Sequence, residues 1–208
     1  MDAAEWDERY AASDLMWGAD PNRFVAAECA DLPPGRAIDL ACGEGRNAIW
    51  LATRGWHADG VDWSKVAIDK AERLAAHAGV TSHTTFACGD LLDYEPAARA
   101  YELVLLAYLQ VPDAARRVIF SRAAAAVAPG GTFLLVAHDG HNLTDGTGGP
   151  PDASVLYEPD DVVVLLDGFV VERAEHVQRE VAGAPRPAID CLVRARRPPQ
   201  ERAAEASA

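Results

Sequence analysis

Acidic residues and glycines stand where three short apolar runs of the chain end. The first run leads into 39–47, which reads DLACGEGRN, the second ends at Asp62 and the third at Asp90. Gly43 and Gly45 allow a tight turn into a helix, whose free N–H groups attract a carboxylate or a phosphate. A carboxylate at the position of Asp62 can accept both hydroxyls of a ribose. Together, these residue types are suited to an adenosyl ligand.

Further groups beside these strand ends suit an adenine ring. Trp63 offers a flat apolar face, and Asp90 could accept the exocyclic amine of the ring. Each feature also has a simpler explanation, with Trp63 as a core residue, Asp90 as a turn former or helix cap, and the glycine turn as packing alone. Their conjunction at consecutive strand ends favours ligand binding over these separate structural explanations.

The elements that must position these residues alternate along the chain. Five apolar runs predict strands buried on both faces, at 37–41, 58–61, 84–87, 101–106 and 132–137, the last after the loop Pro129-Gly130-Gly131. Apolar residues at helical spacing predict helices over 46–54, 64–77, 114–127 and 159–166, with Ser64 and Asp113 as N-caps. Such alternation is typical of a parallel sheet wrapped by helices, an α/β fold.

The order of elements changes after Gly168. Two strand-like runs, 169–173 and 188–195, are separated by a glycine- and proline-containing segment with no helical pattern. The sheet is therefore expected to be mostly parallel and to finish with an antiparallel hairpin. In an open parallel sheet, ligands bind at the carboxyl ends of the strands, where Asp39, Asp62 and Asp90 are expected to lie.

Size and charge set bounds on the function. The chain has 208 residues, of which 50% are hydrophobic and 25% charged, and this predicts one globular domain over 1–197. Residues 198–208 offer little to bury and are expected to form a flexible tail. The net charge of −13 disfavours a nucleic-acid partner, because the phosphate backbone would repel it.

Other sequence features bear on the cellular environment. The start of the chain lacks a basic and apolar leader, and no run of about 18 apolar residues could span a bilayer, so a cytoplasmic protein with no membrane partner is expected. Cys29, Cys42, Cys88 and Cys191 lie far apart and form no C-x-x-C pair. We therefore expect neither a disulfide framework nor a cysteine zinc site, and interpret the four as small buried hydrophobic residues.

The motifs DLACGEG, GVD and GDL, followed by PGG before a strand, resemble those of class I S-adenosylmethionine-dependent methyltransferases. The resemblance covers about residues 6–197 and implies a Rossmann-like seven-stranded sheet with helices on both faces. It implies S-adenosyl-L-methionine as the cofactor and a small-molecule nucleophile as the acceptor, with sulfur, selenium, tellurium, oxygen and nitrogen all open. The CGEGRN turn and the leading aromatic residues are similar to the branch of tellurite-resistance and thiopurine methyltransferases.

In that branch, aromatic residues before the first strand close over the methionine end of the cofactor. Trp6, Tyr10 and Trp17 stand at similar spacing here, so the N-terminal helical segment is expected to be a lid. Indole and phenol faces attract a sulfonium cation, and Tyr10 can also donate to a carboxylate. Ordinary helix packing explains Trp6 equally well, whereas we expect Tyr10 and Trp17 to bind ligand.

The resemblance distributes the cofactor contacts along the strand ends. It implies that Asp62 holds the ribose, that Asp90 and Leu91 hold the adenine, and that Gly43 and Arg46 meet the methionine part. The full set of expected cofactor residues is Tyr10, Trp17, Asp39, Ala41, Cys42, Gly43, Arg46, Asp62, Trp63, Asp90, Leu91 and Ala107.

The chain departs from the branch pattern in two places. Ala41 replaces the first glycine of the turn, which adds one methyl group, so cofactor binding is expected to survive. Thiopurine enzymes carry an arginine after the fourth strand, whereas this chain reads LAYL over 106–109. The second departure argues against a thiopurine-like acidic acceptor.

The segment 138–142, HDGHN, follows the fifth predicted strand at the edge of the expected acceptor pocket. His138 could act as a general base, oriented by a nearby carboxylate, for an acceptor that needs deprotonation. Trp17, Tyr108 and His141 complete the expected substrate contacts. Three polar groups so close could also suggest a metal, but no further His or Cys cluster supports one, and no metal site is expected. The Gly- and Pro-rich segment 142–154 is either a lid over this pocket or a plain surface connection.

Two other functions stay open on the sequence alone. A nicotinamide-dependent oxidoreductase also uses a glycine turn and an acidic residue on a ribose, but Ala48 occupies the place of its third glycine. A non-catalytic adenosyl-binding sensor or scaffold would need the same cofactor groups, because methyl transfer requires few chemical groups. Formation of S-adenosylhomocysteine would separate an enzyme from such a binder.

Overall fold

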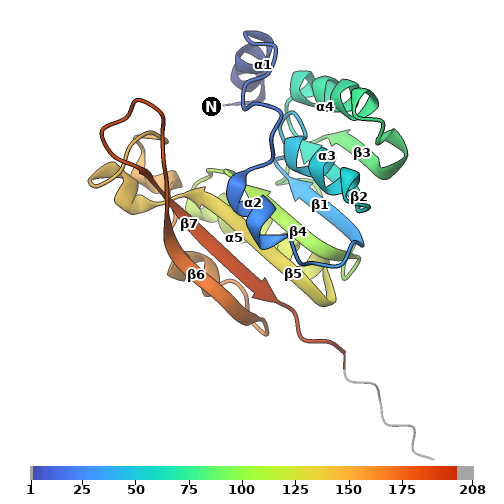
Figure 1. Cartoon of the computed structure of the whole chain (residues 1–208). Helices are drawn as coiled ribbons and strands as arrows, with labels where there is room; N and C mark the ends of the chain where they lie inside the picture. The colour runs from blue at the N-terminus through green and yellow to red at the C-terminus, as the bar shows by residue number, and fades with distance from the viewer. Residues whose placement is uncertain (1, 201–208) are drawn as a thin grey trace, which may run out of the picture.

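A computed structural model describes residues 2–200 and contains one seven-stranded sheet (Figure 1). Its strands are β1 Arg36–Leu40, β2 His57–Asp62, β3 Thr84–Cys88, β4 Tyr101–Ala107, β5 Val127–His138, β6 Val170–Arg179 and β7 Ala188–Arg196. They lie in the order β3-β2-β1-β4-β5-β7-β6. Strand β7 is antiparallel to β5 and β6, and the other pairs are parallel. The predicted mostly parallel sheet with a terminal antiparallel hairpin is confirmed.

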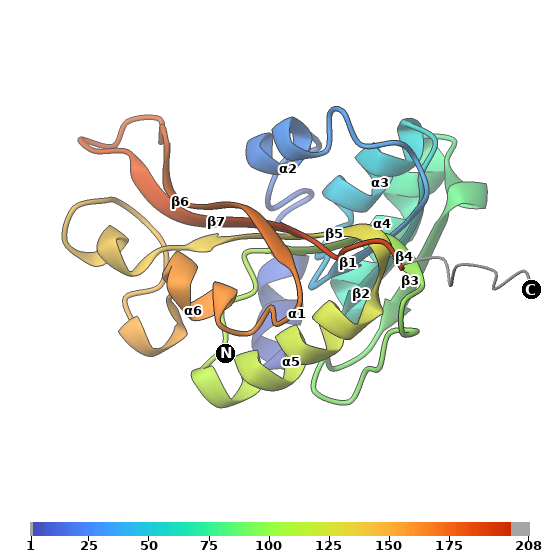
Figure 2. The same ribbon diagram turned by 90° about the horizontal axis from the view of Figure 1, so that it is seen from below.

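Helices cover both faces of this sheet. They are α1 Ala3–Ala11, α2 Arg23–Glu28, α3 Arg46–Thr53, α4 Lys65–His77, α5 Asp113–Ala126 and α6 Pro159–Val163, with short 3-10 turns η1 Thr81–His83, η2 Gly140–Leu143 and η3 Ala153–Val155. Viewed along the sheet, α2 and α3 lie on one face and α5 and α6 on the other (Figure 2). Phe120, Phe133 and Tyr157 belong to the core on the α5 side, and Leu51 and Trp56 to the core on the α3 side.

The structure corrects several predicted boundaries. Strand β5 begins at Val127, so the segment Pro129-Gly130-Gly131 lies inside the strand and not in a loop before it. An irregular register between Tyr101 and Leu103 of β4 accompanies this longer strand. Strand β3 is only partly buried, because it forms one edge of the sheet and has a single neighbour. Helix α6 ends at Val163, three residues before the predicted end at 166.

The two predicted N-caps differ in outcome. The Ser64 hydroxyl accepts the N–H of Ala67, as an N-cap does, so that prediction is confirmed. The prediction for Asp113 is wrong: Pro112 is the N-cap, and Asp113 is the first residue of α5. From there its carboxylate pairs with Arg116 of the same helix at 2.7 Å.

The remaining structural expectations concern cysteines, membranes and the chain end. Cys29, Cys42 and Cys191 are buried, but Cys88 is exposed at the end of edge strand β3, so the buried interpretation fails there. Within residues 2–200, none of the helices combines the length and apolar character needed to cross a bilayer. Residues 198–200 are exposed and carry no secondary structure, and the rest of the predicted tail lies outside the described residues.

Candidate functional site

A sharp turn between β1 and α3 forms the centre of the candidate site. Ala41, Gly43 and Gly45 all adopt positive φ, at 65°, 54° and 77°. A Cβ on Gly43 would lie 2.7 Å from the hydroxyl oxygen of Tyr10, so any other residue there would have to displace the Tyr10 side chain from the turn. Gly45 is the N-cap of α3 and offers no side-chain acceptor. The first N–H groups of α3 are therefore left without a side-chain cap and can meet a ligand carboxylate.

Asp62 ends β2 and reaches across to this turn. Its two carboxylate oxygens accept the N–H groups of Gly43 and Ser64 at 2.8 and 2.9 Å. Burial raises the pKa of Asp62, and these two backbone donors act in the opposite direction. The carboxylate is thus fixed beside the glycine turn, where the sequence analysis expected an acceptor for ribose hydroxyls.

Asp39, near the end of β1, is a buried carboxylate without a partner. Its exposed fraction is 1%, and neither oxygen has a hydrogen-bond partner among residues 2–200. Burial raises the pKa of Asp39 to about 7, against the opposing charge of nearby Arg46. An isolated buried carboxylate is costly unless a cation or hydrogen-bond donor meets it. The α-ammonium group of a methionine moiety is such a donor, so this carboxylate suits the methionine end of the expected cofactor.

The N-terminal segment covers the turn from above. Tyr10 is buried against Gly43, and its hydroxyl accepts the indole N–H of Trp17 at 3.4 Å. The ring centroids of Trp6 and Tyr10 lie 5.6 Å apart. Trp6 thus packs against Tyr10 on α1, in agreement with the alternative of ordinary helix packing. Trp17 is 47% exposed and Arg46 donates to its backbone carbonyl at 2.9 Å. The structure therefore brings Tyr10, Trp17 and Arg46 together beside the glycine turn.

A buried ion pair that the sequence analysis did not identify fastens this segment. The Lys70 ammonium lies 2.9 Å from Glu44 and also donates to the backbone carbonyls of Tyr10 and Ser13 at 2.6 and 2.5 Å. Glu44 accepts the N–H of Met16 through its other oxygen, at 2.8 Å. Glu44 comes from the glycine turn and Lys70 from α4, so one polar cluster joins the turn, α4 and the N-terminal segment.

A second fastening lies at the start of α4. The carboxylate of Asp7 accepts the Ser64 hydroxyl at 2.5 Å and the N–H of Val66 at 3.2 Å. Helix α1 is thereby held against the N-terminus of α4, next to Asp62.

The expected adenine contacts lie farther along the sheet. Asp90 is exposed and accepts the N–H of Leu92 at 2.8 Å. It therefore acts as a turn former, which the sequence analysis gave as the alternative to adenine binding. Leu91 is buried and Trp63 half-buried. Cys42 is buried within the turn, and Ala107 is half-buried at the end of β4. These residues line the same sheet edge as Asp39 and Asp62.

On the other side of the turn, Tyr108, His138, Arg179 and Asp190 form one polar cluster, the acceptor-side cluster. Asp190 Oδ2 accepts the Tyr108 hydroxyl and Arg179 Nε, each at 2.8 Å, and Asp190 Oδ1 lies 3.3 Å from His138 Nδ1. Burial alone would raise the pKa of Asp190, but His138, Arg179 and Tyr108 together lower it. The cluster thus holds an ionised carboxylate against one nitrogen of the His138 ring.

Two expectations about this cluster need correction. His138 is the last residue of β5, paired with Asp190 of β7, and does not lie in the loop. His141 does not join it: its ring bonds to Asp139, which points to a different set of side chains. The carboxylate that orients His138 is therefore Asp190, more than 50 positions along the chain.

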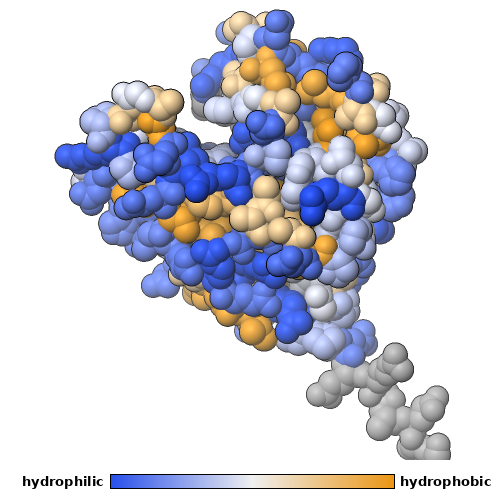
Figure 3. Space-filling view, in the orientation of Figure 1, coloured by the Kyte–Doolittle hydropathy of each residue, from blue (hydrophilic) through white to orange (hydrophobic). Residues whose placement is uncertain are grey.

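The segment 142–154 is tied down beside His138. A Cβ on Gly149 would lie 3.0 Å from Cγ of the His138 ring. The Asn142 side chain donates to the carbonyls of Thr147 and Gly148 and accepts the N–H of Ile189 at 2.8 Å. The loop is therefore an ordered wall of the acceptor-side cluster. Figure 3 shows the surface hollowed between the lobe that carries α1 and the projecting end of the β6–β7 hairpin.

Comparison with known proteins agrees with this geometry. Residues 37–131 match the family model of a methyltransferase domain. A probable thiol methyltransferase 2 of Arabidopsis thaliana is 25% identical over 194 residues, which is 91% of this chain and 83% of that protein.

Two solved structures share the fold. One, from work on the conversion of a disulfide bond into a thioacetal group during echinomycin biosynthesis, has a TM-score of 0.74 at 21% identity and covers 94% of this chain and 91% of its own. The other is magnesium protoporphyrin IX methyltransferase of Synechocystis PCC 6803 with bound SAH, with a TM-score of 0.64 at 20% identity, covering 93% of this chain and 84% of that one.

The chain is a class I S-adenosylmethionine-dependent methyltransferase. Its cofactor is S-adenosyl-L-methionine, which confirms the prediction made from the glycine turn and the strand-end carboxylates. The oxidoreductase and the non-catalytic binder are thereby set aside. These relatives do not confirm the narrower resemblance to the tellurite-resistance and thiopurine branch.

Proposed function

We propose that the enzyme transfers the methyl group to a small-molecule thiol, with His138 as general base. The observation that carries the proposal is the acceptor-side cluster, in which Asp190 lies 3.3 Å from Nδ1 of His138, so that the proton would be accepted at the other ring nitrogen. The similarity to a probable thiol methyltransferase of Arabidopsis thaliana supports sulfur as the acceptor atom. The net charge of −13 supports a small acceptor over a nucleic acid.

We assign the cofactor contacts from the positions of the side chains. Asp62 and its neighbour Trp63 hold the ribose and one face of the adenine, while Asp90 and Leu91 meet the adenine edge. The turn at Ala41, Cys42 and Gly43 faces the methionine part. Asp39 receives its ammonium group, and Arg46, Tyr10 and Trp17 stand near its carboxylate. Ala107 lies between this half and the acceptor-side cluster. The unpartnered oxygens of Asp39 support this orientation.

When bound, the cofactor would supply an electrophilic methyl group on a sulfonium, and in-line attack of the acceptor sulfur on that carbon would release S-adenosylhomocysteine. His138 accepts the thiol proton at Nε2, because Nδ1 faces Asp190. Tyr108 and Arg179 keep the Asp190 carboxylate ionised and in place, so the imidazolium that forms is stabilised. Loop 142–154 and the N-terminal segment exclude water and hold the reactants in line, and such positioning contributes ~7–11 kcal/mol in favourable cases.

The first experiment is isothermal titration of the protein with S-adenosylmethionine, S-adenosylhomocysteine and NADH. We expect micromolar binding of the first two and none of NADH. Formation of S-adenosylhomocysteine is then measured with matched panels of small thiols, phenols and amines. Turnover confined to thiols supports the proposal, and turnover confined to phenols or amines overturns sulfur as the acceptor atom.

Asp62→Ala tests the cofactor assignment in the same assay. Loss of a charged hydrogen bond should weaken S-adenosylmethionine binding by ~1.5–3 kcal/mol, about 10- to 150-fold. Asp69→Ala is the control, because this aspartate lies on α4 and pairs with Lys65 at the surface. Equal affinity in both variants would remove Asp62 from the site.

A further inference from the structure

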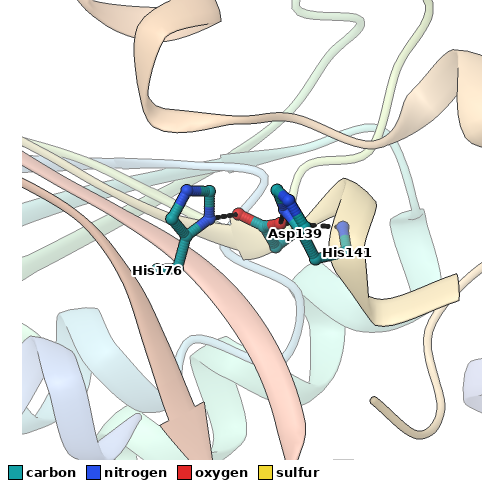
Figure 4. Close-up of side chains that lie close together, drawn as sticks. All are labelled: Asp139, His141 and His176. Atoms are coloured by element: carbon teal, nitrogen blue, oxygen red, sulfur yellow. Dashed lines mark hydrogen bonds and ion pairs between the residues drawn. The ribbon is translucent and has the colours of Figure 1, made fainter. Parts of the chain in front are cut away.

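A carboxylate and two imidazoles meet at the end of β5, outside the methyl-transfer site (Figure 4). Asp139 is fully buried, and its two oxygens contact different rings. Oδ1 lies 2.9 Å from Nδ1 of His141, and Oδ2 lies 2.7 Å from Nδ1 of His176. The two rings meet edge to face with centroids 4.7 Å apart. Three potential ligand atoms thus converge, all within 4.8 Å of one another.

This group is separate from the acceptor-side cluster although its residues neighbour it in sequence. Successive side chains of a strand point to opposite faces of the sheet. His138 and its partner Asp190 therefore face one way, whereas Asp139 at the strand end and His176, which pairs with Cys191, face the other. The sequence predicts no metal here because only His138 and His141 lie near Asp139 along the chain. His176 comes from β6, 37 positions away, and no local pattern indicates it.

The cluster opens on a pocket of about 260 Å³. The pocket is lined by His141, Asp145, His176, Gln178 and Ile189. Both imidazoles are about half exposed, while the carboxylate behind them is not exposed at all. An ion could therefore enter from the pocket without moving the backbone, and a position opposite the three ligands would remain accessible to water or to Asp145.

The donor set selects the kind of ion. Imidazole suits zinc, copper, nickel and iron, whereas magnesium and calcium prefer oxygen ligands only. Zinc takes tetrahedral nitrogen and oxygen ligands at about 2.0–2.2 Å, which places ligand atoms roughly 3.4 Å apart. The three ligand atoms lie within 4.8 Å of one another, and binding would bring one Asp139 oxygen and the two Nδ1 atoms closer to that spacing.

We propose that Asp139, His141 and His176 form a binding site for a divalent transition-metal ion of the zinc type. The site uses one carboxylate oxygen and the Nδ1 atom of each ring, and its fourth position faces the pocket. The ion ties β5, η2 and β6 together at the base of loop 142–154. This inference goes beyond the methyl-transfer proposal, because none of its three ligands takes part in that reaction.

The test is a titration of the chelator-treated protein with Co²⁺, followed by displacement with Zn²⁺. We expect one equivalent of Co²⁺ to give the visible absorption of a tetrahedral site, and Zn²⁺ to remove it. His176→Gln and His141→Gln should each weaken Zn²⁺ binding by about 100-fold or more, since even changes outside the ligand shell cost 10- to 100-fold. Mg²⁺ at the same concentration should not compete. Circular dichroism of each variant checks that it folds.

His83→Gln is the matched control. His57 and His83 also stack with ring centroids 4.8 Å apart, but no carboxylate of the described residues pairs with them. Retained binding in His83→Gln and lost binding in the two cluster variants supports the site. Equal Zn²⁺ affinity in wild type, His176→Gln and His141→Gln would place the ion elsewhere, and the lack of a tetrahedral Co²⁺ spectrum in the wild type would mean that the histidines only cap a buried aspartate. Either result overturns the proposal, and neither depends on methyl-transfer activity.

Discussion

Asp39 and Asp190 are both buried aspartates near strand ends, yet their surroundings are opposite. Asp190 contacts Tyr108, Arg179 and His138, and its pKa lies below its usual range. Asp39 has no hydrogen-bond partner among the described residues, and its pKa is raised to about 7. The Asp39 carboxylate thus lacks any protein donor among these residues, whereas one oxygen of Asp190 accepts two donors. The two aspartates lie in opposite halves of one sheet, Asp39 in the proposed ligand-binding half and Asp190 in the hairpin half.

The largest expected difference between the two aspartates is in how each makes the free energy of unfolding depend on pH. The folded-state pKa of Asp39 is raised from 3.8 to about 7, so ionisation of Asp39 opposes folding. The stability of the folded protein therefore decreases as pH rises from about 4 to about 7. About 3 pKa units correspond to about 4 kcal/mol. Asp39→Asn should therefore be more stable than wild type above neutral pH, by up to this amount, in urea unfolding of the ligand-free protein.

Asp190 should behave in the opposite way. Its folded-state pKa is lowered, so its contribution to stability is present above the unfolded-state pKa and is lost as pH falls through the folded-state value. Asp190→Asn should therefore lose stability at neutral pH and approach wild type in acid. For comparison, the groups that influence the pKa of Asp39 are Arg46 and Asn47 of α3 and Asp62 of β2. Parallel pH profiles for the two variants would contradict the comparison.

The buried Lys70–Glu44 pair is an exception within the ligand-binding half, because it is fully satisfied. Removing one partner of a buried ion pair leaves an uncompensated charge, so Lys70→Met should lower the free energy of unfolding by about 3 kcal/mol. Lys65→Met on the same helix is the control, since the Lys65–Asp69 pair is exposed, and it should cause no measurable change in unfolding. Similar losses in the two variants would show that the Lys70 pair is effectively solvated.

The acceptor-side cluster should affect turnover without affecting cofactor affinity. If His138 removes the thiol proton, His138→Gln should lower kcat by ~100-fold with a thiol of high pKa and much less with one already ionised. The dissociation constant of S-adenosylmethionine should stay the same in titration calorimetry. A uniform loss for both thiols would show that His138 shapes the pocket and does not transfer a proton.

The smallest expected effect concerns the strained turn. Ala41 has φ of 65°, a conformation that costs an L-residue roughly 1–2 kcal/mol, partly offset by the lower chain entropy of alanine in the unfolded state. Ala41→Gly should therefore stabilise the fold by about 0.5–1 kcal/mol. Ala107→Gly, in strand β4 where φ is not positive, should destabilise it. Thermal unfolding of both variants measures the difference, and destabilisation by Ala41→Gly would indicate that its methyl group packs usefully.

The two halves also differ in how far the sequence predicted them. The ligand-binding turn is local: strand, glycine turn and helix lie within residues 36–53, so the motif predicts both structure and position. Asp62 follows the same rule, because it ends the next strand and sits opposite the turn. The lack of a helical pattern between the last two strand-like runs likewise predicts the antiparallel hairpin after Gly168.

The side-chain contacts of the hairpin half escaped prediction because they join residues far apart in the sequence. Asp190, Arg179 and His176 become neighbours of β5 only through the register of β6 and β7, which no local pattern specifies. Helix α2 was not predicted because six residues are too few for a periodic signal; Asn22 at its N-cap was the available local clue. The Lys70–Glu44 pair also was not predicted, because the two residues lie on different elements and no local pattern indicates their contact.

The fastening of the N-terminal segment has a consequence for kinetics. Its polar bonds end on the glycine turn and on α3 and α4, the elements that we assign to the floor of the cofactor site. With the cofactor placed under Tyr10 as proposed, we expect a ligand to leave only when several of these bonds open together. We therefore expect the opening of α1 to govern how long the demethylated cofactor stays bound, and so to slow turnover after the displacement at carbon.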